Sequence, residues 1–72
     1  SSNATLTLDV VDRAEVAVRV IDGTGRVVAS RLYGAIQGAF DIDLPTAQFA
    51  EGLYVVSVQI GDNVYTRKLV VQ

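Results

Sequence analysis

The 72-residue sequence contains no histidine, cysteine, methionine or tryptophan. Histidine is the commonest general base, cysteine is the strongest side-chain nucleophile, and both ligate transition metals. Their absence removes most routes to catalysis, and the absence of cysteine also excludes disulfide bonds as a source of stability. We therefore expect a protein that is not an enzyme and that holds neither a metal ion nor an organic cofactor.

Long apolar runs and strong positive charge are also lacking. No apolar stretch approaches the roughly 18 residues of a transmembrane helix, and no signal-peptide pattern is present. The net charge is −2, and the basic residues cluster only at Arg67-Lys68. This charge distribution argues against nucleic acid as a partner.

Hydrophobic residues make up half of the sequence and alternate with polar residues at a period of two. β-Branched residues dominate these runs, and no window shows helical spacing. Such alternation is typical of strands with one buried and one exposed face. The sequence predicts an all-β domain with six strands, at residues 4–11, 14–22, 26–33, 39–44, 53–60 and 64–71.

Turn-forming residues separate the predicted strands. Asp22-Gly23-Thr24-Gly25 fits a hairpin loop in which Gly25 takes a positive φ angle, and Gly61-Asp62-Asn63 fits a second hairpin. Pro45 ends the strand before it, since proline cannot donate to a sheet. Strands at this spacing predict an antiparallel β-sandwich or a small barrel.

Two segments fall outside these strands. Residues 46–52 are too few for an ordinary helix and are predicted to form a loop with one helical turn, in which Phe49 plugs an end of the core. Residues 1–4 are set aside as an expression remnant or a disordered segment. This leaves one domain, at residues 5–72.

Three sets of residues are weak candidates for a catalytic or ligand-binding site. Asp41 and Asp43 share one strand face, which would suit Ca²⁺, but an exposed polar face explains them better. The segment Gly23-Thr24-Gly25 resembles part of a phosphate loop, yet no helix follows it. The residue types Ser57, Asp62 and Lys68 have no spacing that argues for a mechanism.

Four sequence elements follow one another in the order of one known family. A hydrophobic strand leads into Asp-x-x-Gly-Arg-Val-Val within Val18–Val28, and Ile42-Asp43-Leu44 follows. Glu51–Val56 then contains Gly-x-Tyr, and Thr66–Gln72 ends the sequence. Over residues 5–72 the chain resembles the C-terminal sorting domain of type IX (Por) secretion substrates.

This resemblance implies a secretion signal. Such a domain directs a cargo protein, often a protease or adhesin, from the periplasm through the type IX outer-membrane translocon to the surface of a Gram-negative bacterium. The implied partners are translocon components and a surface sortase-like protease, which commonly removes the domain before the cargo is joined to lipopolysaccharide. The implied fold is an immunoglobulin-like β-sandwich, so we expect six to seven strands.

The resemblance assigns residues where the motifs match. Asp22, Gly25 and Arg26 fall on the first turn motif, where turn geometry alone requires Gly25. Gly52 and Tyr54 fall on the second motif, where Gly52 allows a tight start to a core strand and Tyr54 is expected to bury its ring.

The terminal motif is the expected site of recognition by translocon or protease. An edge strand offers unpaired backbone groups that a receptor, or a second copy of the chain, can pair with. We expect the Lys68 side chain to face solvent if Leu69 and Val71 point inward, although ordinary strand pairing explains the two aliphatic residues equally well. The residues assigned to recognition are Lys68, Leu69, Val70, Val71 and Gln72.

Two other non-catalytic functions fit the same residues. One is a carbohydrate-binding or adhesive module in which Tyr33 and Tyr65 form a stacking platform, although both are ordinary strand residues. The other is a structural spacer like the immunoglobulin-like domain of flagellar hook-cap proteins, whose Asp-x-x-Gly-Arg hairpin is similar. Neither function needs a sequence that ends on a strand, whereas a C-terminal signal does.

Overall fold

The computed structural model describes residues 4–72, which form four β-strands and one short 3-10 helix. The strands make one antiparallel sheet in the order β2-β1-β3-β4, so β4 is an edge strand. The all-β prediction is confirmed. The elements are β1 (Ala4–Ile21), β2 (Val27–Leu44), η1 (Thr46–Gln48), β3 (Gly52–Ile60) and β4 (Asn63–Val71).

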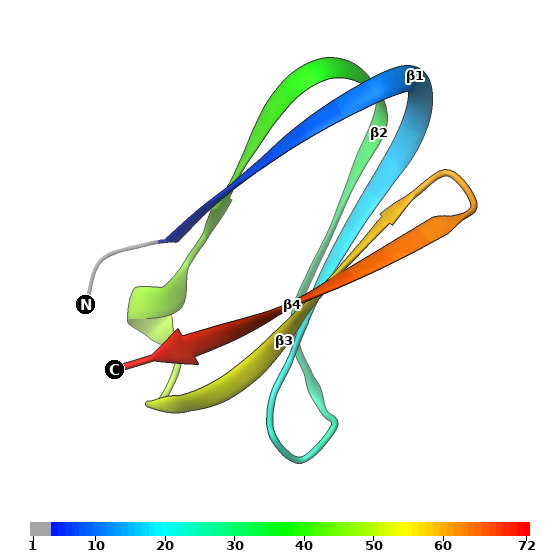
Figure 1. Cartoon of the computed structure of the whole chain (residues 1–72). Helices are drawn as coiled ribbons and strands as arrows, with labels where there is room; N and C mark the ends of the chain where they lie inside the picture. Colours follow the sequence, from blue (N-terminus) through cyan, green and yellow to red (C-terminus); the bar gives the residue numbers. More distant parts are fainter. Residues whose placement is uncertain (1–3) are drawn as a thin grey trace.

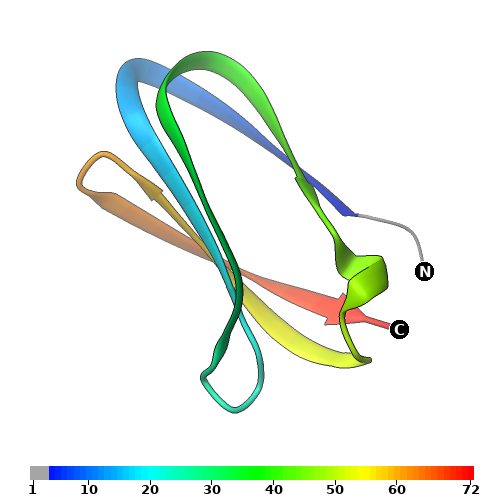
Figure 2. The ribbon, with the colours of Figure 1, turned by 180° about the vertical axis from the view of Figure 1, so that it is seen from behind.

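β1 and β2 form a long hairpin that bends over in its middle (Figures 1 and 2). β3 pairs with the second half of β1, from Val16 to Ile21. The first half of β1 and the second half of β2 return over the core. The register shifts at the bend, between Val10 and Ala14 of β1. In β2, Gly34 and Gly38 have positive φ angles of 72° and 89°, which glycine adopts easily, so the strand turns without ending.

The predicted immunoglobulin-like sandwich of six to seven strands is not confirmed, because the structure has four strands in one sheet. The predicted strands 4–11 and 14–22 are the two halves of β1, and 26–33 and 39–44 are the two halves of β2. The intervening Val11-Asp12-Arg13 contains no glycine or proline, and the backbone passes through it as a bulge. Predicted strands 53–60 and 64–71 match β3 and β4 to within one residue.

The described part of the chain begins with Ala4, which the predicted domain boundary sets aside with residues 1–3. β1 begins there, one residue before the predicted domain boundary, and Ala4 pairs with Leu44. Residues 1–3 lie outside the described part of the chain.

The core lies between the returning half of the β1–β2 hairpin and the inner face of β1, β3 and β4. Val18 of β1 pairs across the sheet with Val58 of β3, and Val20 pairs with Val56. Burying one aliphatic side chain of this size contributes about 1.5–3 kcal/mol, so this cluster is the main source of stability. The buried hydrophobic residues are Val10, Val16, Val18, Val20, Ile42, Leu44, Tyr54, Val56, Val58 and Val71.

One end of the core is closed by the segment between β2 and β3. Pro45 follows the last residue of β2, and η1 forms one turn in which the amide of Phe49 donates to the carbonyl of Thr46 at 3.1 Å. The Phe49 ring is partly buried and stacks on Tyr54, with ring centroids 5.2 Å apart. The prediction of one helical turn with Phe49 plugging the core is confirmed.

Candidate functional site

The first family motif forms the loop between β1 and β2. The Asp22 carboxylate accepts hydrogen bonds from the Thr24 amide at 2.9 Å, the Thr24 hydroxyl at 2.6 Å and the Arg26 amide at 3.0 Å. These bonds lower the pKa of Asp22 from 3.8 to about 2, and the bond from the Thr24 hydroxyl has the largest effect. Gly25 has φ 89°, as predicted, so Asp22 and Gly25 serve to shape the turn.

The second motif starts β3 and reaches into the core. Gly52 has φ 152°, a backbone angle that favours glycine, which supports the prediction of a tight strand start. The Tyr54 ring is buried, as predicted, and its hydroxyl donates to the carbonyl of Ala50 at 2.6 Å. This bond ties the loop to the strand, so Tyr54 acts on the fold and presents no exposed ring to a partner.

The terminal motif occupies β4, with side chains on both faces of the sheet. Val71 is buried and Leu69 is half-buried, and both point into the core. Lys68 is exposed and Val70 is 60% exposed, and both face outward. The prediction that Lys68 faces solvent is confirmed. Gln72 is exposed just beyond the strand.

The three motifs meet at one end of the sheet. Val70 is the cross-strand partner of Leu53, the residue after Gly52. The carbonyl oxygen of Leu53 would lie 3.8 Å from a Cβ atom on Gly23, in the β1–β2 loop. Residues far apart in sequence therefore present one continuous surface around the end of β4.

The structure does not bring Tyr33 and Tyr65 together. They lie on β2 and β4, the two opposite edge strands of the sheet. Tyr33 is half-buried and packs edge-to-face on Phe40, with ring centroids 5.1 Å apart. Tyr65 is 49% exposed and lines a groove with Leu6 and Leu8 of β1. The two rings therefore cannot form one stacking platform.

The other candidate residues also find structural roles. The Asp41 carboxylate accepts a hydrogen bond from Thr7 at 3.0 Å, and the Asp43 carboxylate accepts one from Thr5 at 3.1 Å. Asp41 and Asp43 thus lie on an exposed polar face, on the opposite side of the strand from the buried Ile42.

The residues Ser57, Asp62 and Lys68 are not brought together. Ser57 pairs across the sheet with Thr66, whereas Lys68 pairs with Val55. Asp62 lies in the turn after β3, at the far end of the β3–β4 hairpin from the end of β4.

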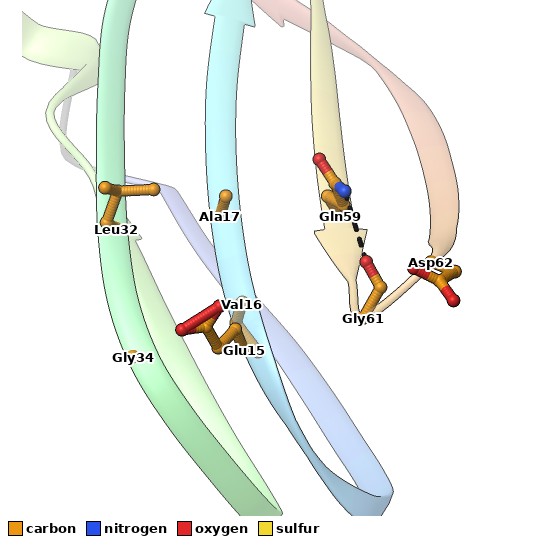
Figure 3. A pocket seen from close by; sticks show the side chains of 8 residues that line it. All are labelled: Glu15, Val16, Ala17, Leu32, Gly34, Gln59, Gly61 and Asp62. Atoms are coloured by element: carbon orange, nitrogen blue, oxygen red, sulfur yellow. Dashed lines mark hydrogen bonds between the residues drawn. The ribbon is translucent and has the colours of Figure 1, made fainter.

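A shallow pocket of about 530 Å³ lies on the outer face, where the β1–β2 register shifts between Val16 and Ala17 (Figure 3). Leu32 and Asp62 lie at opposite ends of it, and the Glu15 side chain extends toward β2. Gln59 donates a hydrogen bond to the carbonyl of Gly61 at 3.1 Å. The two carboxylates therefore do not converge on a point where they would share a ligand. No local sequence pattern indicates this pocket, because its walls come from three strands.

Within residues 4–72 no helix is long and apolar enough to cross a membrane. In the same range, no group of three or more acidic side chains is placed to hold a metal ion.

Comparison with protein-family models matches residues 1–72 to the family described as "Secretion system C-terminal sorting domain". No curated protein sequence and no solved structure matches the chain. The family match covers the motifs at Asp22–Arg26, Gly52–Tyr54 and Lys68–Gln72, and it confirms the resemblance inferred from them. Such a domain interacts with the type IX secretion machinery and implies export to the cell surface or the extracellular space. The chain therefore belongs to the family of secretion system C-terminal sorting domains, and it is a sorting signal for type IX secretion.

Proposed function

We propose that the secretion machinery recognises this domain through the last part of β4, Lys68–Gln72, while the rest of the fold holds that segment in place. The observation that carries this proposal is the division of the segment between two faces. Leu69 and Val71 point into the core, whereas Lys68 and Val70 are exposed. The inward residues fix the register of the strand, and the outward residues are free to contact a receptor.

The outer edge of β4 adds backbone groups to this contact. β4 pairs with β3 along one side and is the last strand of the sheet. Its other side therefore offers donors and acceptors to a strand of the receptor, the mode called β-augmentation. Backbone pairing would supply affinity, and Lys68 with Gln72 would supply specificity.

The proposed route follows what the family implies. The cargo crosses the periplasm with the folded domain attached, and an outer-membrane translocon engages the domain. A surface sortase-like protease then removes it, and the cargo is joined to lipopolysaccharide. The domain itself performs no catalysis in this scheme, in agreement with the lack of histidine and cysteine.

Fusion of the 72-residue chain to a periplasmic reporter tests the recognition step in a type IX-competent cell. We expect the fusion to reach the cell surface, and Lys68→Glu to leave it in the periplasm. Val64→Glu is the matched control, since Val64 is also exposed and faces outward on β4 but lies at the far end of the strand, opposite Gln59. Circular dichroism of the purified variants checks that both remain folded.

Surface export of Lys68→Glu at the level of the unmodified fusion would contradict the proposal. Deletion of Lys68–Gln72 is a weaker test because it also removes Leu69 and Val71 from the core. A point substitution at an exposed position separates recognition from folding.

A further inference from the structure

An apolar patch lies on the outer face of the sheet, beside the terminal motif. Ile21 of β1 has Val27 of β2 and Val55 of β3 as its cross-strand neighbours. Leu53 and Val70 form the next pair toward the end of β4. We call these five residues the outer patch. Val27, Leu53 and Val70 are 50%, 52% and 60% exposed.

The outer patch differs from the row of residues next to it on the same face. In that row Arg19 lies between Ser30 and Ser57 as cross-strand neighbours, and Thr66 follows on β4. A solvent-facing sheet surface is normally polar, as this second row is.

At the other end of the face Leu32 and Val64 are also exposed, but Ala17 and Gln59 lie between them. The residues of the outer patch are contiguous, and a contiguous exposed apolar patch is a feature of binding surfaces.

Two positively charged side chains border the outer patch. Lys68 is the cross-strand neighbour of Val55, and Arg19 precedes Ile21 by two positions on the same face of β1. Neither the outer patch nor the adjoining row contains an acidic residue. The nearby Asp22 carboxylate is occupied by its own loop and by the Arg26 side chain at 3.3 Å.

The opposite face of the molecule is acidic and polar, whereas the outer patch is apolar with positive charges at its border. The returning half of the β1–β2 hairpin carries Asp9, Asp41 and Asp43 at outward, exposed positions. Thr5 and Thr7 lie between these carboxylates and bond to two of them. That face holds threonines where a partner for the outer patch would need apolar side chains, so this face of a second copy does not supply the matching surface.

We propose that the outer patch, with Arg19 and Lys68, is a docking surface for a protein of the secretion machinery that presents apolar side chains bordered by carboxylates. This inference rests on the proposed function and extends it: the contact reaches from β4 across β3 and β1 to β2. Opposite charges at the border of an interface steer association and fix its orientation, while the apolar centre contributes most of the affinity.

Val70→Asp and Val64→Asp give a matched pair for the apolar part. Both valines lie at outward positions on β4, and they are 60% and 59% exposed, but Val64 lies at the far end of the strand, opposite Gln59. We expect Val70→Asp to lower surface export of the reporter fusion by about tenfold or more, the loss typical of one central interface contact. Val64→Asp should leave export unchanged.

Leu53→Asp and Arg19→Glu test whether the contact extends beyond β4. Both positions lie outside Lys68–Gln72 and are exposed, so the substitutions leave the terminal motif and the core residues intact. We expect both to reduce export while circular dichroism shows folded domains. Normal export of both variants, with Lys68→Glu still blocked, would overturn the docking surface and leave the proposed function standing. Normal export of Lys68→Glu as well would overturn both.

Vesicles containing lipopolysaccharide test a lipid as the source of the negative charge. We expect the purified chain not to bind them at physiological salt. Binding that is lost in Lys68→Glu but retained in Leu53→Asp would identify an anionic lipid as the ligand and overturn the protein docking surface.

Discussion

Substitution of Val71 by alanine should show which face of β4 packs into the core. Val71 and its neighbour Val70 have the same side chain on the same strand, but Val71 is 6% exposed and Val70 is 60% exposed. Val→Ala removes two methyl groups in each case. The loss of β-propensity is shared by both variants and cancels in the comparison.

The expected difference follows from burial. At about 0.8 kcal/mol per buried methyl group, Val71→Ala costs about 1.5 kcal/mol in transfer free energy, and the cavity it leaves raises this toward about 3 kcal/mol. The same arithmetic gives about 0.6 kcal/mol for Val70→Ala, because less than half of that side chain is buried. A domain of this length is stable by roughly 4–10 kcal/mol, so the first variant loses a large fraction of its stability.

Urea unfolding followed by far-ultraviolet circular dichroism measures both values. The chain has no tryptophan, so backbone signal is a better probe than fluorescence. With a slope near 1 kcal/mol per molar urea, the midpoint should fall by about 1.5 M or more for Val71→Ala and by about 0.6 M for Val70→Ala. Equal shifts, or a larger shift for Val70→Ala, would refute the assignment of inward and outward faces, because a slip of one residue exchanges them.

Two further predictions concern the β1–β2 loop. Gly25→Ala should destabilise the domain by about 1–2 kcal/mol in urea unfolding, because the φ angle of 89° is unfavourable for a residue with a Cβ. Gly23→Ala should cost less, because a Cβ atom there meets its nearest neighbour at 3.8 Å. Equal losses of stability in the two variants would contradict the backbone argument. The folded-state pKa of Asp22, about 2, lies below its ordinary 3.8, so the stability it contributes is complete above about pH 5 and is lost as pH falls from there toward pH 1. The urea midpoints of the unmodified chain and Asp22→Asn should therefore converge over that pH range, and a constant difference down to pH 2 would refute the lowered pKa.

Local chemistry explains why much of the fold could be predicted from the sequence. Alternation of apolar and polar residues depends on the two-residue repeat of a strand, so it correctly placed Val71 inward and Lys68 outward. The positive φ of Gly25 and the burial of Tyr54 were likewise predictable, since each follows from the residue type and its immediate neighbours.

The strand count failed because a bend and a turn look alike in sequence. Both interrupt the alternation, and Gly34 and Gly38 are ordinary turn residues. What keeps β2 continuous is its pairing with β1 on both sides of the bend, from Gly34 opposite Val16 to Gly38 opposite Val10. That pairing is a long-range contact, which no local pattern specifies.

The outer patch lay beyond sequence reasoning for the same reason. Each of its residues occupies an outward position that alternation can assign. Their proximity depends on the strand order β2-β1-β3-β4, which places Ile21 between Val27 and Val55. The terminal motif alone pointed to β4, whereas the sheet adds three more strands to the surface around it.

The hairpin pairing described above also determines how the chain can fold. The β1–β2 ladder starts at Ile21 and Val27, beside the loop, and extends rung by rung to Ala4 and Leu44. β3 and β4 close in the same way from Ile60 and Asn63. Each ladder can therefore grow from its own turn without closing a long loop in a single step. β4, the strand that carries the signal, forms within the second hairpin. Docking of that hairpin against β1 completes the domain. We therefore expect the secretion machinery to recognise the signal only after this last step of folding.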